Sequence, residues 1–229
     1  PYDRPVQRTR EIIDIVRMVW SGQRVTYAGK VFTLDKGLKI LNHGHRTDIP
    51  IFVASLGPKN VAMTAELAEG WLPYPFSTEH GPRIFKESLD EGRAQRDPKL
   101  PPLRIAPFAP CFIGDKKQGL EFGRWVIGFY IGGMGSREKN FYNQLVQRYG
   151  FVDEAKKVQD LFLSGDKPAA IAATPDELVD QCSVSGDEAE ARDRLHAFED
   201  AGATDLVVSF GGDPASRVDQ LKALARANA

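Results

Sequence analysis

The sequence predicts an α/β fold in which helices wrap a parallel sheet. Short apolar stretches alternate along the chain with longer segments of helical periodicity. The stretch at residues 50–55, Pro-Ile-Phe-Val-Ala-Ser, is nearly all apolar, as expected for a strand with both faces buried. The composition is that of a globular protein, with 42% hydrophobic residues, 27% charged residues and a net charge of −1.

The chain begins with a predicted helix over residues 5–20. Its apolar residues recur at helical spacing and form one stripe, made of Ile12, Ile13, Val16, Val19 and Trp20. Pro5 suits the first turn of this helix, and Ser21-Gly22 ends it. Residues 25–27 and 31–34 flank a short polar turn and predict a small β-hairpin.

Four strands follow, and we expect them to be consecutive and parallel in one curved sheet: residues 50–56, 70–73, 103–112 and 204–209. The helices predicted between and after them cover residues 59–68, 78–96, 116–132, 140–149, 152–163, 176–182, 188–201 and 214–227. Pro107 and Pro110 lack the backbone N–H group that a sheet needs, so the third strand should have an irregular end. Four strands are too few for a closed barrel of eight but enough for a doubly wound sheet, so the count leaves both folds open.

Charge and composition argue against several kinds of partner and site. The near-neutral charge gives no electrostatic reason to expect nucleic acid or an anionic membrane. No apolar stretch approaches the roughly 18 residues that span a bilayer, and we recognise no signal peptide. Cys111 and Cys182 have no metal-ligand spacing, so we expect reduced, buried thiols in a cytoplasmic protein. We expect no metal site, and His43 and His45 are interpreted as solvated loop residues.

The strongest local signal for a binding site is residues 54–60, Ala-Ser-Leu-Gly-Pro-Lys-Asn. A buried strand ends there, and Pro58 suits the first turn of the following helix. The free N–H groups and positive end of that helix would hold a phosphate, with Ser55 adding a hydroxyl group and Lys59 a charge. The alternative is an ordinary strand–turn–helix in which Ser55 and Gly57 only supply turn geometry.

Two other segments follow predicted strands. Residues 209–214 have a similar form, but Asp213 would cap the next helix and put a carboxylate where a phosphate would bind, which favours a plain cap. Trp71, Tyr74 and Phe76 alternate with prolines, and they could equally wall a flat ring or cover the core. The sequence holds no Walker loop, Rossmann fingerprint or G-x-S-x-G motif.

Several stretches of the chain resemble luciferase-like oxidoreductases, and specifically the group that depends on coenzyme F420. The resemblance covers almost the whole chain. Its longest and most specific stretch is Phe-Tyr-Ile-Gly-Gly-Met-Gly-Ser-Arg-Glu-Lys-Asn-Phe-Tyr at residues 129–142. The other stretches are looser and lie at residues 1–5, 8–11, 19–22, 27–29, 49–60, 68–73 and 201–208.

The resemblance implies a TIM-type (β/α)8 barrel, of which this chain supplies strands five to eight and the surrounding helices. Residues 1–229 would then be a single domain, the C-terminal half of the barrel, with a helical segment over residues 114–186 within it. Strands one to four would be absent, so the chain alone is expected to be inactive.

The activity that the resemblance implies is hydride transfer between coenzyme F420 and an organic substrate. The cofactor ring would lie across the barrel mouth, and the loop after the fifth strand would hold its phosphate. On this sequence the expected cofactor-binding residues are Ala54, Ser55, Leu56, Gly57, Pro58, Lys59, Gly70 and Trp71. Catalytic residues cannot be mapped, because the matching positions belong to the absent half. Glu69 stands where the family usually has Asp, which is a small departure.

Two alternatives remain. The first is an FMN-dependent monooxygenase of the same superfamily, because FMN and F420 share the ribityl phosphate. The second is a non-catalytic half-barrel that needs a partner, since four strands leave two open sheet edges. If strands one to four are missing, Phe52, Val53 and Val207 should border an open apolar face or an intermolecular contact. We expect a small-molecule substrate and a homo-oligomer, specifically a dimer.

Overall fold

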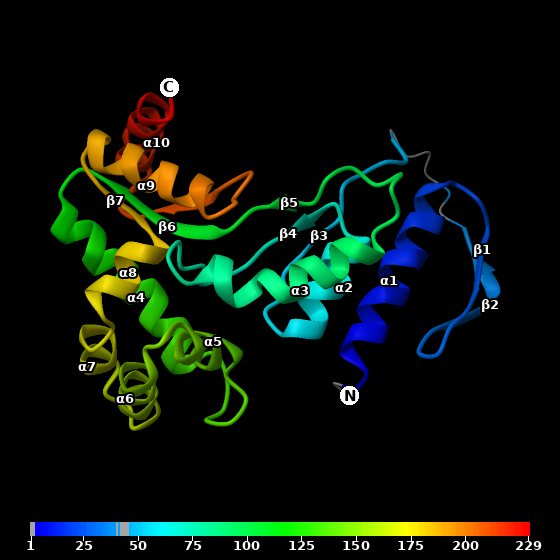
Figure 1. Ribbon diagram of the computed structural model, residues 1–229, viewed down its shortest axis with the longest axis horizontal. Coiled ribbons are helices and arrows are strands. Elements are labelled where there is room, and N and C mark those ends of the chain that lie inside the picture. Colours follow the sequence, from blue (N-terminus) through cyan, green and yellow to red (C-terminus); the bar gives the residue numbers. More distant parts are fainter. Residues whose placement is uncertain (1–2, 40, 42–45) are drawn as a thin grey trace. The chain divides into compact units, whose positions relative to one another are not determined.

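The computed structural model describes residues 3–39, 41 and 46–229 (Figure 1). The chain divides into two compact units, residues 1–71 with 87–103 and residues 72–86 with 104–229. Helix α3 (Gly81–Gln95) begins in the second unit and ends in the first. Nothing in the structure tests the prediction of one domain over residues 1–229, so it stays a prediction.

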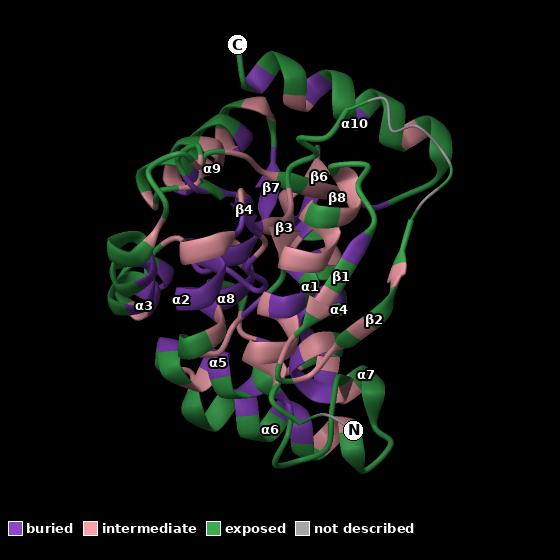
Figure 2. Ribbon diagram, turned by 90° about the vertical axis from the view of Figure 1, so that its right-hand side faces the viewer, coloured by how far each residue is buried: buried purple, intermediate pink, exposed green. Residues whose placement is uncertain are grey.

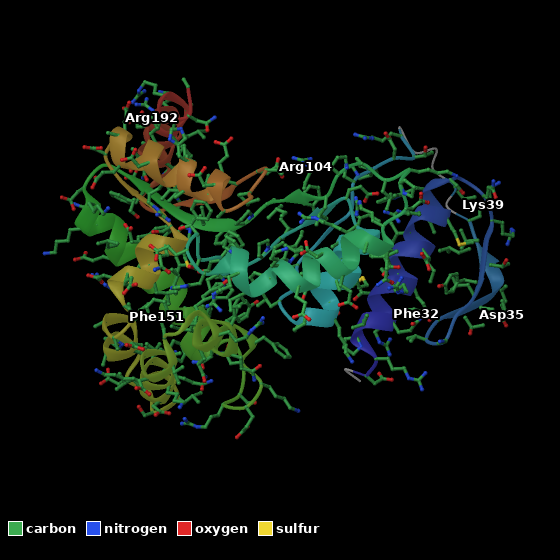
Figure 3. All side chains as sticks on the ribbon, in the orientation of Figure 1. Phe32, Asp35, Lys39, Arg104, Phe151 and Arg192 are labelled. Atoms are coloured by element: carbon green, nitrogen blue, oxygen red, sulfur yellow. The ribbon has the colours of Figure 1, made fainter. Side chains whose placement is uncertain are left out.

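The first unit begins with the predicted helix and hairpin, α1 (Pro5–Trp20), β1 (Val25–Ala28) and β2 (Thr33–Leu38). The two strands are antiparallel. Glu11 of α1 is buried, and its carboxylate accepts hydrogen bonds from the backbone N–H groups of Lys30, Val31 and Phe32 at 2.7, 3.1 and 2.8 Å. Val31 and Phe32 were predicted as strand but lie before β2, because their N–H groups bind Glu11. Figure 3 labels Phe32, Asp35 of β2, and Lys39, which directly follows β2.

The rest of the first unit is a short β–α–β segment with the end of α3, made of β3 (Phe52–Val53), α2 (Pro58–Leu67) and β4 (Gly70–Trp71). β3 and β4 are parallel, with Phe52 opposite Gly70 and Val53 opposite Trp71. Both strands are shorter than predicted. Five consecutive residues of α2, numbers 61–65, are buried, so this helix belongs to the core of the unit.

The second unit contains a parallel sheet in the order β7-β6-β8, with β6 (Phe108–Ile113), β7 (Val184–Gly186) and β8 (Val207–Phe210). Phe108 lies opposite Val207, and Cys111 lies opposite both Val184 and Phe210. Helices α9 (Glu188–Asp200) and α10 (Pro214–Ala227) contact the strands of this sheet (Figure 1). The parallel pairing predicted for residues 103–112 and 204–209 is therefore confirmed.

Five helices lie between β6 and β7: α4 (Lys116–Gly133), α5 (Phe141–Tyr149), α6 (Val152–Leu163), α7 (Lys167–Ala172) and α8 (Asp176–Cys182). They occupy the segment predicted to be helical, residues 114–186. Their buried faces meet around α4, which contacts all the others (purple residues in Figure 2). Gly128 of α4 lies so close to Thr174 that an added Cβ would be 2.6 Å from its hydroxyl oxygen.

The structure corrects the expectation that the four predicted strands form one sheet, since β3 and β4 belong to a different sheet from β6 and β8. The predicted strand 103–112 is two strands, β5 (Arg104–Ile105) and β6, because Pro107 interrupts the ladder between them. One neighbour of β6 is β7, a strand that was not predicted. Helix α7 was not predicted either. Parallel sheets and abundant helices give an α/β fold, but the described residues form no closed barrel.

The expectation that both cysteines are free and buried was confirmed, whereas the open apolar face expected at Phe52, Val53 and Val207 stays a prediction. Cys111 and Cys182 are free and buried, and burial raises the pKa of the Cys111 thiol to about 12. Val207 is 43% exposed, whereas Phe52 and Val53 are half-buried. None of the helices in the described part of the chain is long and apolar enough to cross a membrane.

Candidate functional site

The candidate site is the loop between β3 and α2, residues 54–59, which we call the β3–α2 loop. Gly57 is the N-cap of α2, with extended backbone (φ −71°, ψ 143°), and Pro58 occupies the first helical turn as predicted. Ala54, Pro58 and Lys59 are exposed, while Leu56 and Gly57 are half-buried. The loop is therefore open to a ligand along most of its length.

Helix α2 begins without a side-chain cap, since Gly57 has none to offer. The first N–H group with a partner is that of Val61, which donates to the Gly57 carbonyl at 2.9 Å. Over the described ranges of the chain, the N–H groups of Lys59 and Asn60 have no hydrogen-bond partner. Two unpaired donors at the positive end of a helix favour an anion, and this was the arrangement predicted for the loop.

The hydroxyl group of Ser55 is used inside the protein. Thr64 donates to the Asn60 carbonyl at 2.7 Å, so in its 2.9 Å contact with the Ser55 hydroxyl it must accept. Ser55, which is 9% exposed, therefore gives its proton to Thr64 rather than offering it to a ligand. This differs from the expectation that Ser55 supplies a hydroxyl group to a phosphate. The backbone N–H groups and Lys59 remain for that role.

Trp71 and Gly70 support the β3–α2 loop from the core. The Trp71 side chain is completely buried, and its indole N–H donates to the Ser55 carbonyl at 2.8 Å. A Cβ atom at position 70 would collide with the ring of Phe52, so only glycine fits there. These two predicted site residues thus fix the position of the loop, and the Trp71 ring is not exposed to a ligand in this structure.

Glu69, where the sequence departs from the usual pattern, joins three parts of the first unit. Its carboxylate accepts the N–H group of Ile51 at 2.8 Å and pairs with Arg17 of α1 at 2.6 Å. Arg17 also donates to the Leu67 carbonyl at the end of α2, at 2.6 Å. The longer glutamate side chain therefore connects α1, the start of β3 and the end of α2.

A cavity of about 200 Å³ adjoins the β3–α2 loop within the first unit, lined by Arg8, Thr9 and Ile12 of α1 and by Ala54, Ser55 and Asn60, among others. Arg8 is held by Asp3, with Nη2 and Oδ1 3.0 Å apart, and its guanidinium lies 5.4 Å from the centre of the Phe32 ring. The hydrogen bond from Arg8 lowers the pKa of Asp3. Lys59 is not among the lining residues. Asn60 belongs to the predicted segment 54–60 but was not among the expected cofactor-binding residues, and the cavity was not predicted.

The parallel strands of the second unit are followed by a different kind of helix start. Asp115, Asp187 and Asp213 are the N-caps of α4, α9 and α10, and each carboxylate accepts backbone N–H groups of its own helix. These helix starts carry their own anion, so a phosphate would meet a like charge there. The interpretation of residues 209–214 as a plain cap is confirmed.

The remaining aromatic candidates are buried. Tyr74 and Phe76 are 8% and 2% exposed, so with Trp71 they cover the core rather than wall an open ring site. No group of three or more metal-ligating side chains gathers anywhere in the described residues. His43 and His45 lie outside the described residues.

The sequence matches the luciferase-like monooxygenase family model over residues 1–205. A Mycobacterium tuberculosis protein, named as a proposed coenzyme F420-dependent oxidoreductase, is 38% identical over 97% of this chain and 67% of its own length. The 5,10-methylenetetrahydromethanopterin reductase of Archaeoglobus fulgidus is 25% identical over 90% of this chain and 60% of its own length. The chain thus spans about two thirds or less of these relatives.

Solved structures share the fold at low sequence identity. The coenzyme F420-dependent tetrahydromethanopterin reductase of Methanopyrus kandleri has a TM-score of 0.77 at 20% identity, over 96% of this chain and 62% of that one. An F420-dependent secondary alcohol dehydrogenase, solved with an F420-acetone adduct, has a TM-score of 0.61 at 17% identity, over 96% of this chain and 60% of the dehydrogenase chain. The likeness extends over nearly all of this chain.

Proposed function

The chain belongs to the luciferase-like monooxygenase family, and from this premise we propose that its protein is an F420-dependent oxidoreductase. The reaction is hydride transfer between the deazaflavin ring, which carries the hydride when bound, and an organic substrate. The proposal draws on the relatives named for F420 dependence, one of them 38% identical to this chain.

The observation that carries the proposal is the uncapped start of α2. The N–H groups of Lys59 and Asn60 are unpaired there, whereas the helices after β6, β7 and β8 are capped by aspartate. The residues present fit the phosphate of the cofactor, because two backbone donors and the positive helix end complement its charge. In this proposal Lys59 adds a positive charge. The hydrogen bond from Trp71 to the Ser55 carbonyl holds the β3–α2 loop in place.

The finer architecture is also a proposal. We place β3, β4, β6 and β8 as strands five to eight of an eight-stranded α/β barrel, with β5 as the irregular start of the seventh. The parallel pairs β3 with β4 and β6 with β8 support this order. The cofactor-binding residues then lie after the fifth strand, at the edge of a barrel where parallel strands end and ligands bind.

The oligomeric state, the location and the substrate class are also proposals. We propose a homodimer in the cytoplasm that acts on a small organic molecule, and the large exposed apolar side chains Val207, Val218 and Leu221 give a partner subunit something to cover. Sedimentation analysis of the full-length protein checks the dimer.

The test of the function is fluorescence titration of the full-length protein with F420 and with FMN, followed by an oxygen-consumption assay. We expect F420 to bind and its reduced form to transfer hydride without consuming oxygen. Tight binding of FMN alone, with oxygen consumed in proportion to product, would favour the monooxygenase alternative. Binding of neither cofactor would contradict the proposal.

A further inference from the structure

Three tyrosine rings of the second unit pack against one another. Tyr74 lies between β4 and α3, Tyr130 on α4 and Tyr142 on α5. The ring centres of Tyr74 and Tyr130 are 4.6 Å apart, those of Tyr130 and Tyr142 are 4.9 Å apart, and those of Tyr74 and Tyr142 are 6.4 Å apart. The first two pairs meet edge to face, a favoured aromatic geometry. We call these three residues the tyrosine cluster.

One hydroxyl group of the tyrosine cluster, that of Tyr74, is buried and unsatisfied. Tyr74 is 8% exposed, and its hydroxyl group has no hydrogen-bond partner in the part of the chain that the structure describes. Tyr130 and Tyr142 are only half-buried. A buried hydroxyl group without a partner is uncommon in native proteins and calls for a ligand or a functional reason.

The Tyr74 hydroxyl group is held in place as a donor. Its neighbours in the chain are fixed, because the Pro73 carbonyl accepts the N–H group of Phe108 at 3.2 Å and the Pro75 carbonyl accepts the Tyr149 hydroxyl group at 2.9 Å. Burial, and then the nearby Cys182, Tyr130 and Tyr142, raise the pKa of Tyr74 well above its ordinary value. The phenol is therefore protonated at neutral pH and can donate to an acceptor.

The surroundings of the tyrosine cluster are aromatic and uncharged. Phe108 packs edge-on against Tyr74 at 5.1 Å, and Phe129 packs against Tyr130 at 5.9 Å. The side-chain amides on either side of Tyr142 are already used: that of Asn140 donates to the Tyr130 and Ile131 carbonyls, and that of Asn143 to the Ile131 and Ala155 carbonyls. An ionic ligand would find no opposite charge among these neighbours, whereas an apolar molecule with one acceptor oxygen would be complemented.

We propose that the tyrosine cluster is a binding subsite for a neutral organic molecule that carries a carbonyl oxygen beside an aromatic or apolar group. The Tyr74 hydroxyl group donates to the carbonyl oxygen, and the rings of Tyr130 and Tyr142, which reach the surface, contact the apolar part. That this molecule is the substrate of the oxidoreductase rests on the proposed function, but the binding itself does not.

The probe is acetophenone, a neutral aromatic ketone, titrated by ligand-observed NMR into the full-length protein without cofactor. We expect Tyr74→Phe to weaken binding about tenfold, which corresponds to the loss of one hydrogen bond. Benzoate, of similar size but charged, should bind more weakly than acetophenone. Tyr74→Phe should leave the melting temperature within about 1 °C of wild type, because the hydroxyl group it removes has no partner.

Tyr149→Phe is the matched control, since it removes a buried tyrosine hydroxyl group that does have a partner. It should lower the melting temperature by about 2–4 °C. The proposal is overturned if wild type does not bind acetophenone, or if Tyr74→Phe binds it equally well. It is also overturned if Tyr74→Phe lowers the melting temperature as much as Tyr149→Phe, because the hydroxyl group would then already be bonded. Because no cofactor is present, these outcomes are independent of the F420 and FMN titrations.

Discussion

Replacing Trp71 with phenylalanine tests whether this residue supports the β3–α2 loop from within. The Trp71 side chain is 0% exposed, and its indole N–H donates to the Ser55 carbonyl at 2.8 Å. Trp71→Phe leaves that buried carbonyl without this donor, which costs about 1–3 kcal/mol. The smaller ring leaves a void of at least methyl size, which adds about 1 kcal/mol. We expect a loss of about 2–4 kcal/mol in the free energy of unfolding.

The assay is urea unfolding of the full-length protein, followed by far-UV circular dichroism because the substitution removes a fluorophore. Trp125→Phe is the matched control, since Trp125 is 57% exposed on α4 and stacks on Phe129 with ring centres 6.4 Å apart. That exposed substitution should change the free energy of unfolding by less than about 0.5 kcal/mol. Equal effects of the two substitutions would refute the supporting role of Trp71.

Two further predictions concern the first unit. Gly92→Ala should lower the free energy of unfolding by about 1–2 kcal/mol, because the added methyl group collides with the Ala62 carbonyl, and this cost outweighs the gain of about 1 kcal/mol in helix propensity. Increased stability of the variant in urea unfolding would contradict this prediction. Burial alone would raise the pKa of Glu11, but hydrogen bonds from Gln7 and from three backbone N–H groups lower it below its usual 4.5. Its stabilising effect should therefore be full above about pH 4.5 and be lost as the pH falls through the lowered value. The stability difference between wild type and Glu11→Gln, measured by urea unfolding from pH 7 downwards, should shrink below pH 4.5, and a constant difference would argue against this linkage.

Features set by local sequence were predictable. Helix α1 has the predicted bounds, because sixteen residues of regular periodicity begin at a proline and end before Ser21-Gly22. The start of α2 and the Asp213 cap followed from residue types whose backbone preferences are strong. The free N–H groups of the β3–α2 loop follow from the same local rules.

Features set by contacts between distant residues were not predictable. β7 has three residues, Val184–Gly186, which is too short for an alternating pattern, and its place beside β6 depends on packing. Trp71 looked like a possible ring-facing residue, and only its burial against the β3–α2 loop gives it another role. Glu69 departs from the usual residue of the family, but its partners Arg17 and Ile51 lie 52 and 18 positions earlier in the chain. No sequence signal marks such pairs.

Gly57→Val tests most directly whether the β3–α2 loop binds the cofactor phosphate. A Cβ atom at position 57 would have nothing within 4 Å, and the extended backbone there suits valine, so the protein should fold normally. The branched side chain would obstruct close contact between a phosphate and the free N–H groups. In fluorescence titrations with F420 and FMN, Lys59→Glu should weaken binding by about 1–3 kcal/mol, and Gly57→Val should weaken it more. Unchanged affinity in both folded variants would mean that the loop is only a turn.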